Sequence, residues 1–327
     1  MKSIEVIGIG AMNIDQLYCV ERILADGEAS VKEFSSQPGG SAANTIYGLA
    51  RLAIRSGFIG AVGDDETGKT LVEDFARGGV DISQIKVKKG SETGSVLCLS
   101  DKQGRRSLYV LPGANSLLDE EDVDLEYINQ AKVLHLSSFI NDRQFELQKQ
   151  IVARLSPSVK VSFSPGSIYA TKGIHQLAPL LNKTYVLFLN RNEMEQLTGE
   201  DFITGAKRCL EQGCYLVVTT LGGTKTKLSE KGGQRATLAC YILHDDGEYL
   251  IESKGGQEEP SVDTTGAGDA FAAGFLYGLL KGKDLPQCGF LGDIMARFSI
   301  TKIGAREGLP SLAELSQKYY ASFEQWL

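Results

Sequence analysis

The feature that most constrains this chain is a series of short, almost wholly apolar runs separated by longer segments with helical periodicity. The runs are rich in β-branched residues, a pattern typical of strands buried on both faces of a parallel sheet with helices crossing between them. The 327 residues suffice for one large α/β domain or two smaller ones. The predicted strands are Glu5–Ile9, Gly57–Val62, Val133–Leu136, Val159–Phe163, Tyr185–Leu189 and Tyr215–Thr219.

Two helices can be placed from their apolar positions. A helix over 42–53 is predicted from small and apolar residues that share one face, with Ser41 as its N-cap. A second covers Ala270–Leu280, and the chain after Gly266 is predicted to contain helices and no further strands.

Two regions break this rhythm with antiparallel patterns. Alternating residues and a polar turn at 101–104 predict a small lid outside the main sheet, from segments near 14–36 and 93–112. A hairpin turning at 245–247 is predicted later in the chain. The strand-like arms are Ala29–Ser36, Thr93–Leu99 and Ser107–Leu111 in the lid, and Ala236–Leu243 and Glu248–Glu252 in the hairpin.

Composition excludes several classes of protein. A net charge of −7 and a pI near 5.2 argue against a nucleic-acid partner. No apolar run approaches ~20 residues, so no membrane span or membrane partner is expected. The N-terminus shows no signal-peptide cleavage site, and the six scattered cysteines predict free thiols. These features predict a cytoplasmic protein.

Two glycine-rich turns imitate known phosphate loops. Gly8-Ile-Gly10 lacks the third glycine of a dinucleotide fingerprint and is better explained as a tight strand exit. Gly63–Thr70 matches the P-loop pattern, but three of its four intervening residues are carboxylates, which would repel phosphates. A capped helix start is the preferred interpretation, and a P-loop NTPase that uses Gly63–Thr70 is kept as an alternative.

A third turn, Gly266-Ala-Gly-Asp269, leads directly into the apolar helix. Free N–H groups and the positive end of the helix dipole form an anion site, and Asp269 places a carboxylate beside it. A simple strand-to-helix turn explains these residues equally well when they are taken alone. The second glycine-rich helix start, Pro38-Gly-Gly-Ser-Ala-Ala-Asn44, favours the anion site.

Together these segments resemble the ribokinase, or PfkB-type, carbohydrate kinase family over nearly the whole chain. Pro38–Asn44 matches the family's N-terminal signature, and Asp263–Phe271 matches its C-terminal one. Gly60–Asp64 and Gly79–Asp81 follow the family pattern between them. The resemblance implies a single kinase domain, 1–327, with a three-layer α/β/α core, a mostly parallel central sheet and a small antiparallel β lid.

The resemblance also implies roles at the site of phosphoryl transfer. Asp269 is the expected general base, and the N–H groups of Gly266, Ala267 and Gly268 are expected to hold the phosphoryl oxygens. Asp263 resembles part of a monovalent-cation loop, so activation by K⁺ is expected.

For the phosphate donor, the resemblance implies ATP with Mg²⁺. Asn190 and Glu193 match the family's N-x-x-E element, with Glu193 organising Mg²⁺ through water, although Asn192–Glu195 fits the same letters. Thr220, Gly222 and Gly268 are the further expected nucleotide contacts. Lys225 stands where the family usually has a glycine, and an exposed side chain is expected for it.

For the acceptor, Asn13 and Asp15 match the family's polyol-binding N-x-D, and carboxylate oxygens suit paired hydroxyls. The other expected wall of the site is Gly39, Gly40 and Asn44. In the lid, Arg105 and Arg106 are within reach of an anionic substrate group, although exposed turn arginines are more common.

The sequence therefore predicts ATP-dependent phosphoryl transfer to a small polyhydroxylated substrate, with a narrow preference for an unphosphorylated sugar. A nucleoside kinase is the first alternative, because Phe34, Tyr18 and Tyr109 are candidates for packing on a base. A non-catalytic sugar or nucleotide sensor is the alternative from another class. A homodimer formed through the lid is left open.

Overall fold

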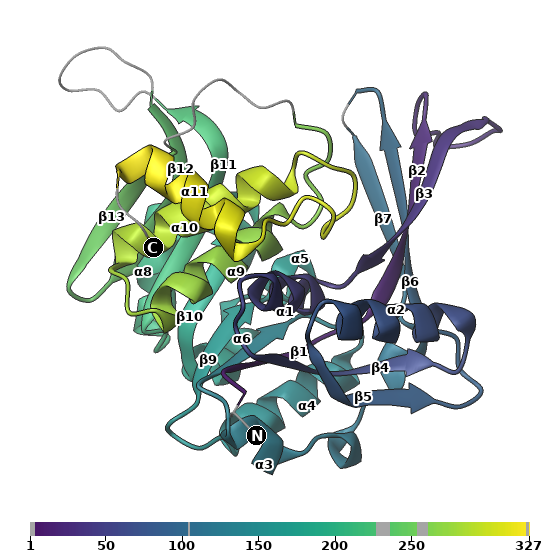
Figure 1. Cartoon of the computed structure of the whole chain (residues 1–327), viewed down its shortest axis with the longest axis horizontal. Helices are drawn as coiled ribbons and strands as arrows, with labels where there is room; N and C mark the ends of the chain where they lie inside the picture. The colour runs from purple at the N-terminus through teal and green to yellow at the C-terminus, as the bar shows by residue number, and fades with distance from the viewer. Residues whose placement is uncertain (1–3, 104, 227–235, 254–260, 325–326) are drawn as a thin grey trace.

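The computed structural model describes residues 4–103, 105–226, 236–253, 261–324 and 327. Its strands form one nine-stranded sheet and one four-stranded sheet (Figure 1). The large sheet has the order β13-β12-β11-β10-β9-β8-β1-β4-β5. Its pairs from β5 to β11 are parallel, and β12 and β13 continue it as antiparallel strands.

All six predicted core strands are present in this sheet, and the predicted hairpin supplies β12 and β13. The one strand that was missed is β5, an edge strand whose lysines and other polar residues conceal it. The strands are β1 Val6–Ile9, β4 Ser56–Gly63, β5 Asp81–Lys88, β8 Val133–Ser137, β9 Lys160–Ser164, β10 Thr184–Asn190, β11 Leu216–Thr226, β12 Ala236–His244 and β13 Gly247–Glu252.

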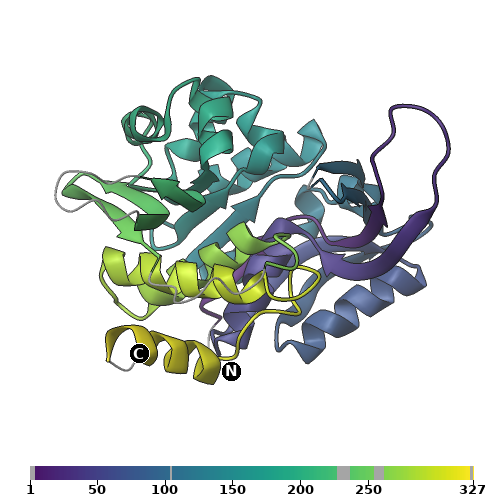
Figure 2. The ribbon, with the colours of Figure 1, turned by 90° about the horizontal axis from the view of Figure 1, so that it is seen from above.

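Helices cover both faces of the large sheet and enclose two apolar cores (Figure 2). The first core is closed by α1 Ser41–Arg51, α2 Glu66–Arg77, α9 Ala267–Leu280, α10 Leu285–Ser299 and α11 Leu312–Phe323. The second is closed by α3 Leu125–Asn129, α4 Asp142–Ala153, α5 Gly166–Ala170, α6 Ile174–Leu181, α7 Arg191–Thr198 and α8 Phe202–Glu211. The three-layer prediction is confirmed. Among the described residues, no strand follows Gly266, as predicted.

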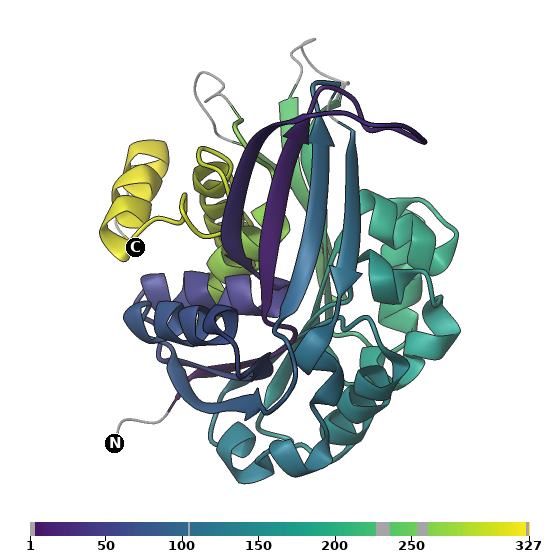
Figure 3. The ribbon, with the colours of Figure 1, turned by 90° about the vertical axis from the view of Figure 1, so that its right-hand side faces the viewer.

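The four-stranded sheet is the predicted lid, with the order β3-β2-β6-β7 (Figure 3). The strands are β2 Asn13–Val20, β3 Val31–Gly39, β6 Gly94–Asp101 and β7 Arg106–Leu111. Its outer pairs are antiparallel, whereas the central pair β2–β6 is parallel, a detail that the antiparallel prediction missed.

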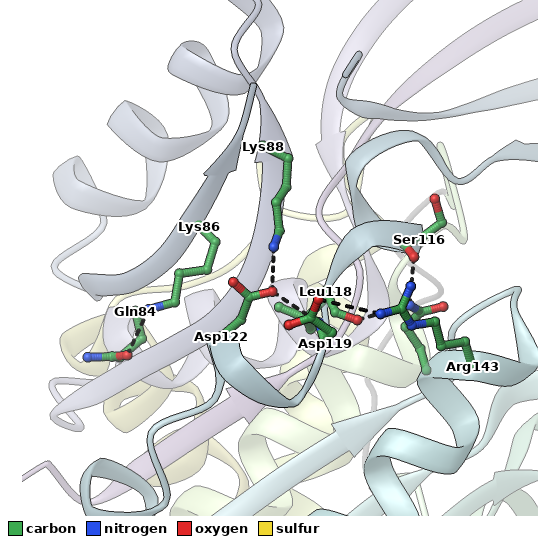
Figure 4. Close-up of polar contacts among 9 residues, drawn as sticks. Gln84, Lys86, Lys88, Ser116, Leu118, Asp119, Asp122 and Arg143 are labelled. Carbon is green, nitrogen blue, oxygen red and sulfur yellow. Dashed lines mark hydrogen bonds and ion pairs between the residues drawn. The ribbon is translucent and has the colours of Figure 1, made fainter. Parts of the chain in front are cut away.

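The segment that leaves the lid contains two 3-10 helices, η1 Gly113–Leu117 and η2 Glu120–Asp122, and is bonded to strand β5 and to helix α4 (Figure 4). Lys88 Nζ lies 2.5 Å from Asp122 Oδ2. On the other side, Gln144 Nε2 donates to the carbonyl oxygens of Ser116 and Leu118, at 2.8 and 3.0 Å. The exit of the lid therefore has a fixed position relative to β5 and α4.

Candidate active site

The site is built around Asp269 in the first turn of α9. Gly266, the N-cap of this helix, has a left-handed φ of 75°, and a Cβ there would lie 2.4 Å from the Cβ of Ala305. A side chain at this position would meet both backbone strain and a clash, so glycine is required for the turn that aims the helix.

Asp269 is held by the first turn of α1. Ser41 Oγ donates to Asp269 Oδ1 at 2.7 Å, and Asn44 Nδ2 donates to Oδ2 at 2.9 Å. Burial raises the pKa of Asp269 to about 6, although these two hydrogen bonds oppose the shift. The prediction that Ser41 caps α1 is wrong, because Gly40 is the N-cap and the serine hydroxyl donates its hydrogen bond to the Asp269 carboxylate.

The predicted anion-binding N–H groups differ in availability. The N–H of Ala267 donates to Thr264 O at 3.3 Å, whereas within the described chain Gly266 and Gly268 donate to no backbone acceptor. A Cβ at Gly268 would meet no atom within 4 Å, so the space above this residue is open. In the described chain, the N–H groups of Gly266 and Gly268 thus have no backbone acceptor, at the helix N-terminus that also carries Asp269.

Asp15 lies close enough to Asp269 for the charge of Asp269 to change the pKa of Asp15. Its side chain is only 9% exposed, and its Oδ1 atom has no hydrogen-bond partner in the described part of the chain. Burial raises the pKa of Asp15 to about 7; Arg306 opposes this shift, and the Asp269 charge adds to it. A Cβ at Gly39 would lie 2.3 Å from the Asp15 carboxyl, so only glycine leaves the space that this group occupies.

Asn13 is oriented by a residue that the sequence analysis did not identify. Asn115 Nδ2 donates to Asn13 Oδ1 at 2.9 Å and to Met12 O at 3.1 Å, while Asn115 Oδ1 accepts from the N–H of Met12 at 2.8 Å. No pattern in the sequence signals this role, because Asn115 lies in η1, more than 100 residues away.

Arg306 is the second residue that was missed, and it connects three parts of the site. Its guanidinium donates to Asn44 Oδ1 at 3.0 Å, to Gly39 O at 3.1 Å and to Asp74 Oδ2 at 2.7 Å. The side chain is 5% exposed. The only signal in the sequence is an arginine within the glycine-rich and apolar stretch 304–310.

On the donor side, Asn190 and Glu193 form a reciprocal capping box at the start of α7. Glu193 Oε2 accepts from the N–H of Asn190, and Asn190 Oδ1 accepts from the N–H of Glu193, both at 2.9 Å. Burial raises the pKa of Glu193, and its charge is felt by Asp269. Glu195, the competing residue, is exposed.

The neighbouring strand exit holds the other predicted nucleotide contacts. Thr220 pairs with Asn190, and the register of β11 shifts just after it. Gly222 has a φ of 60° within open space. The prediction for Lys225 concerns a side chain outside the described part of the structure.

Asp263 and the lid arginines lie on the remaining side. Asp263 Oδ1 accepts from Thr265 N and Oγ1 at 2.9 and 2.7 Å, and Oδ2 accepts from Gly304 N at 3.0 Å. Arg106 donates to Thr264 Oγ1 at 3.0 Å and to Thr265 Oγ1, whereas Arg105 pairs with Asp101. The lid therefore contacts the loop that precedes α9.

The P-loop imitation at 63–70 is a capped helix start. Asp65 Oδ1 accepts from the N–H of Gly68 at 2.7 Å, and Gly63 N donates to Thr93 Oγ1 at 3.0 Å. These two N–H groups already donate hydrogen bonds within the protein, and Lys69 is exposed to solvent beside Glu66.

None of the helices in the described segments combines the length and the apolar character that a membrane span needs.

Comparison with known proteins places these residues in context. A model of the pfkB family carbohydrate kinases matches residues 1–312. An uncharacterized sugar kinase of Archaeoglobus fulgidus is 38% identical over 266 residues, covering 80% of this chain and 98% of that protein. A nucleoside kinase of Methanothermobacter thermautotrophicus is 26% identical over 91% of this chain and 88% of its own. The structure of an Arabidopsis thaliana ribokinase complexed with ribose and ATP matches with a TM-score of 0.79 and 23% identity, covering 96% of this chain and 98% of that one.

Replacing Arg306 by leucine should lower the free energy of unfolding by about 3 kcal/mol, because the change strands buried acceptors on Gly39, Asn44 and Asp74. Urea unfolding measures the loss. Arg77 provides a matched control, since it lies 3.9 Å from the same Asp74 but its side chain is 70% exposed. Arg77→Leu should cost less than about 0.5 kcal/mol. Equal losses in the two variants would contradict the structural role of Arg306.

Proposed function

The chain belongs to the pfkB family of carbohydrate kinases and is a phosphotransferase, and we propose that it transfers the γ-phosphoryl group of ATP to a hydroxyl of a small, unphosphorylated sugar. The observation that carries this proposal is the carboxylate of Asp269, held by two donors beside the N–H groups of Gly266 and Gly268. Membership of a kinase family disfavours the sensor alternative.

In the reaction, Asp269 accepts the proton of the attacking hydroxyl as its oxygen bonds to the γ-phosphorus. The bond from that phosphorus to the β–γ bridging oxygen breaks, and ADP leaves. A pKa of about 6 keeps Asp269 mostly ionised at neutral pH while making it a better base than an ordinary aspartate. The Gly266 and Gly268 N–H groups would stabilise the charge on the transferring oxygens.

Glu193 fits the role of organising Mg²⁺ with ATP. In the capping box, Oε2 of its half-buried carboxylate accepts a hydrogen bond from the N–H of Asn190. Burial raises the pKa of Glu193, and a nearby cation would lower this pKa again. Bound Mg²⁺ would neutralise charge on the phosphates. Asn190, Thr220 and Gly222 end or interrupt adjacent strands there, and we assign the nucleotide to this edge.

The predicted K⁺ near Asp263 remains a prediction. Burial raises the pKa of Asp263, but hydrogen bonds from Gly304 and Thr265 outweigh it and lower the pKa overall. Both carboxylate oxygens are therefore already used to shape the loop. The steps given above do not involve this ion.

The lid favours a sugar over a nucleoside. Side chains alternate between the faces of a strand, so Tyr18, which pairs with Phe34, lies on the face opposite Asp15. Tyr109 pairs with Leu97, which pairs with Gln16, and so lies on that same opposite face. The aromatic residues expected to hold a base therefore point away from Asp15. A nucleoside remains the second candidate, because Leu17, Cys98 and Leu108 share the face of Asp15.

The outer face of the lid supports the homodimer that the sequence left open. Phe34, Tyr109 and Leu111 are 56, 58 and 67% exposed on this face. Neighbouring exposed apolar side chains of this size favour a protein contact. Light scattering should give the mass of a dimer, and Phe34→Lys should shift it to the monomer. An unchanged mass in the variant would count against a lid interface.

Replacing Asp269 by asparagine should lower kcat by roughly 10²–10⁴-fold, because the base is lost while its shape is kept. In the wild type, kcat/KM should rise with pH through about 6 to 7 and level off above that range, since the ionised carboxylates of Asp269 and Asp15 are the active forms. Ser41→Ala removes a donor that lowers the pKa of Asp269, so its acid limb should move to higher pH.

Initial rates of ADP formation measure these effects. Exposed Glu195 provides a control, and Glu195→Gln should leave both kcat and the pH profile unchanged. Near-normal turnover by the Asp269→Asn variant would remove this residue from the mechanism.

ADP formation with a panel of acceptors should be fastest with an unphosphorylated sugar such as ribose or fructose. Above pH 7, where Asp15 is mostly ionised, Asp15→Asn should raise KM for that sugar by roughly tenfold or more, because hydrogen bonds to a charged group are stronger than those to a neutral one. The KM for ATP should stay unchanged. Faster turnover of adenosine, inosine or cytidine would replace the sugar by a nucleoside.

A further inference from the structure

A cavity of about 290 Å³ lies at the end of the main sheet farthest from Asp269. It opens between the first residues of the parallel strands β8, β9 and β10, whereas Asn190 and the candidate active site lie beyond the other ends of these strands. Its apolar floor is the last turn of α9, from Leu276 to Leu280. The ATP and acceptor sites assigned above share none of its lining residues.

At the cavity, β9 presents two polar residues, and two of their three paired neighbours are apolar. Lys160 pairs with Val133, and Ser162 pairs with both His135 and Val186, so these side chains lie on one face of the sheet, toward α9. A serine and a lysine cannot fill the space beneath a leucine-rich helix as two large apolar side chains would. The cavity therefore follows from the sequence of β9.

Four of the apolar residues of the sheet and of α9 that line the cavity are buried. Val133, Val161, Val186 and Leu276 are each at most 7% exposed. Ser162 is fully buried, and its Oγ lies 2.9 Å from His135 Nδ1. Small-molecule sites typically combine such an apolar interior with a few fixed polar groups.

One positive charge at the mouth is held in place without being neutralised. Lys160 Nζ lies 3.9 Å from the ring centroid of Tyr185, and in the described residues no carboxylate lies within ion-pair distance of it. Tyr185 is fixed in turn by stacking on Tyr215, with ring centroids 4.8 Å apart. A cation–π contact positions an ammonium group but leaves its charge available to an anion.

The second lysine at the mouth, Lys132, is already compensated. Its Nζ lies 3.4 Å from Glu5 Oε1. The mouth therefore carries one uncompensated positive charge next to an apolar interior.

We propose that this cavity binds a small monoanion with an apolar body, such as an aromatic or branched aliphatic carboxylate. The apolar body would lie against Val186, Leu276 and Leu279, and the carboxylate would face Lys160. Such a ligand binds together with ATP and the sugar, because the two ends of the sheet share no residues.

Titration calorimetry with benzoate tests this proposal. The wild-type protein should bind benzoate in the millimolar range and should bind benzamide, its neutral isostere, roughly five- to tenfold more weakly. Lys160→Met keeps the aliphatic stem and removes the charge, so it should weaken benzoate binding by roughly five- to tenfold, as one partly solvated charged hydrogen bond would. Lys207→Met, the same change at an exposed lysine of α8, should leave benzoate affinity unchanged.

A second titration separates this cavity from the anion-binding turn at Gly266. Benzoate affinity should be the same with and without saturating ATP, and in the Asp269→Asn variant. Absence of benzoate binding by the wild type, equal affinity for benzamide, equal affinity of the Lys160→Met variant, or competition by ATP would each overturn the proposal. Loss of kinase activity in an Asp269 variant bears only on the proposed reaction.

Discussion

The meeting of two helix N-termini is the contact on which the rest of the site depends. α1 and α9 begin at Gly40 and Gly266, and their first turns approach each other so that Ser41 and Asn44 bond to Asp269. Two helix dipoles then direct their positive ends toward one volume, which favours the ionised carboxylate and would favour the phosphate oxygens of the proposed reaction. Burial works against that charge and raises the pKa of Asp269 to about 6.

Much of this arrangement could be predicted from local pattern. The buried strands, the lid and the two glycine-rich helix starts follow from periodicity and turn residues, because each is encoded within about ten residues. The contacts that bind these pieces together could not be predicted. The local sequence predicts that Ser41 is an N-cap, but its hydroxyl bonds to Asp269, which lies 228 residues away. Asn115 carries no local signal, and Arg306 is marked only by its place in the glycine-rich and apolar stretch 304–310, since both roles depend on groups that only the fold brings together. The residue roles at the site remain predictions that the proposed measurements test.

In the lid, the pairing register of the strands decides which face carries the aromatic residues, and the amino-acid composition alone does not. Tyr18, Phe34 and Tyr109 are suitable residues for packing against a base, and their presence alone favours a nucleoside. Their place on the face opposite Asp15 is fixed by a period of two residues, and it changes their expected partner from a ligand to another protein surface.

Asn115 has a consequence for how the lid can open. One amide joins the end of the core segment at Met12, the start of the lid at Asn13 and the segment by which the chain leaves the lid. Four covalent connections join the lid to the core at this end, and Asn115 fastens two of them, the one before β2 and the one after β7, to each other. β2 and β7 are not neighbours in the sheet, so this amide joins the ends of two strands that do not pair with each other. Any movement of the lid would therefore have to carry the ends of β2 and β7 together or break these hydrogen bonds.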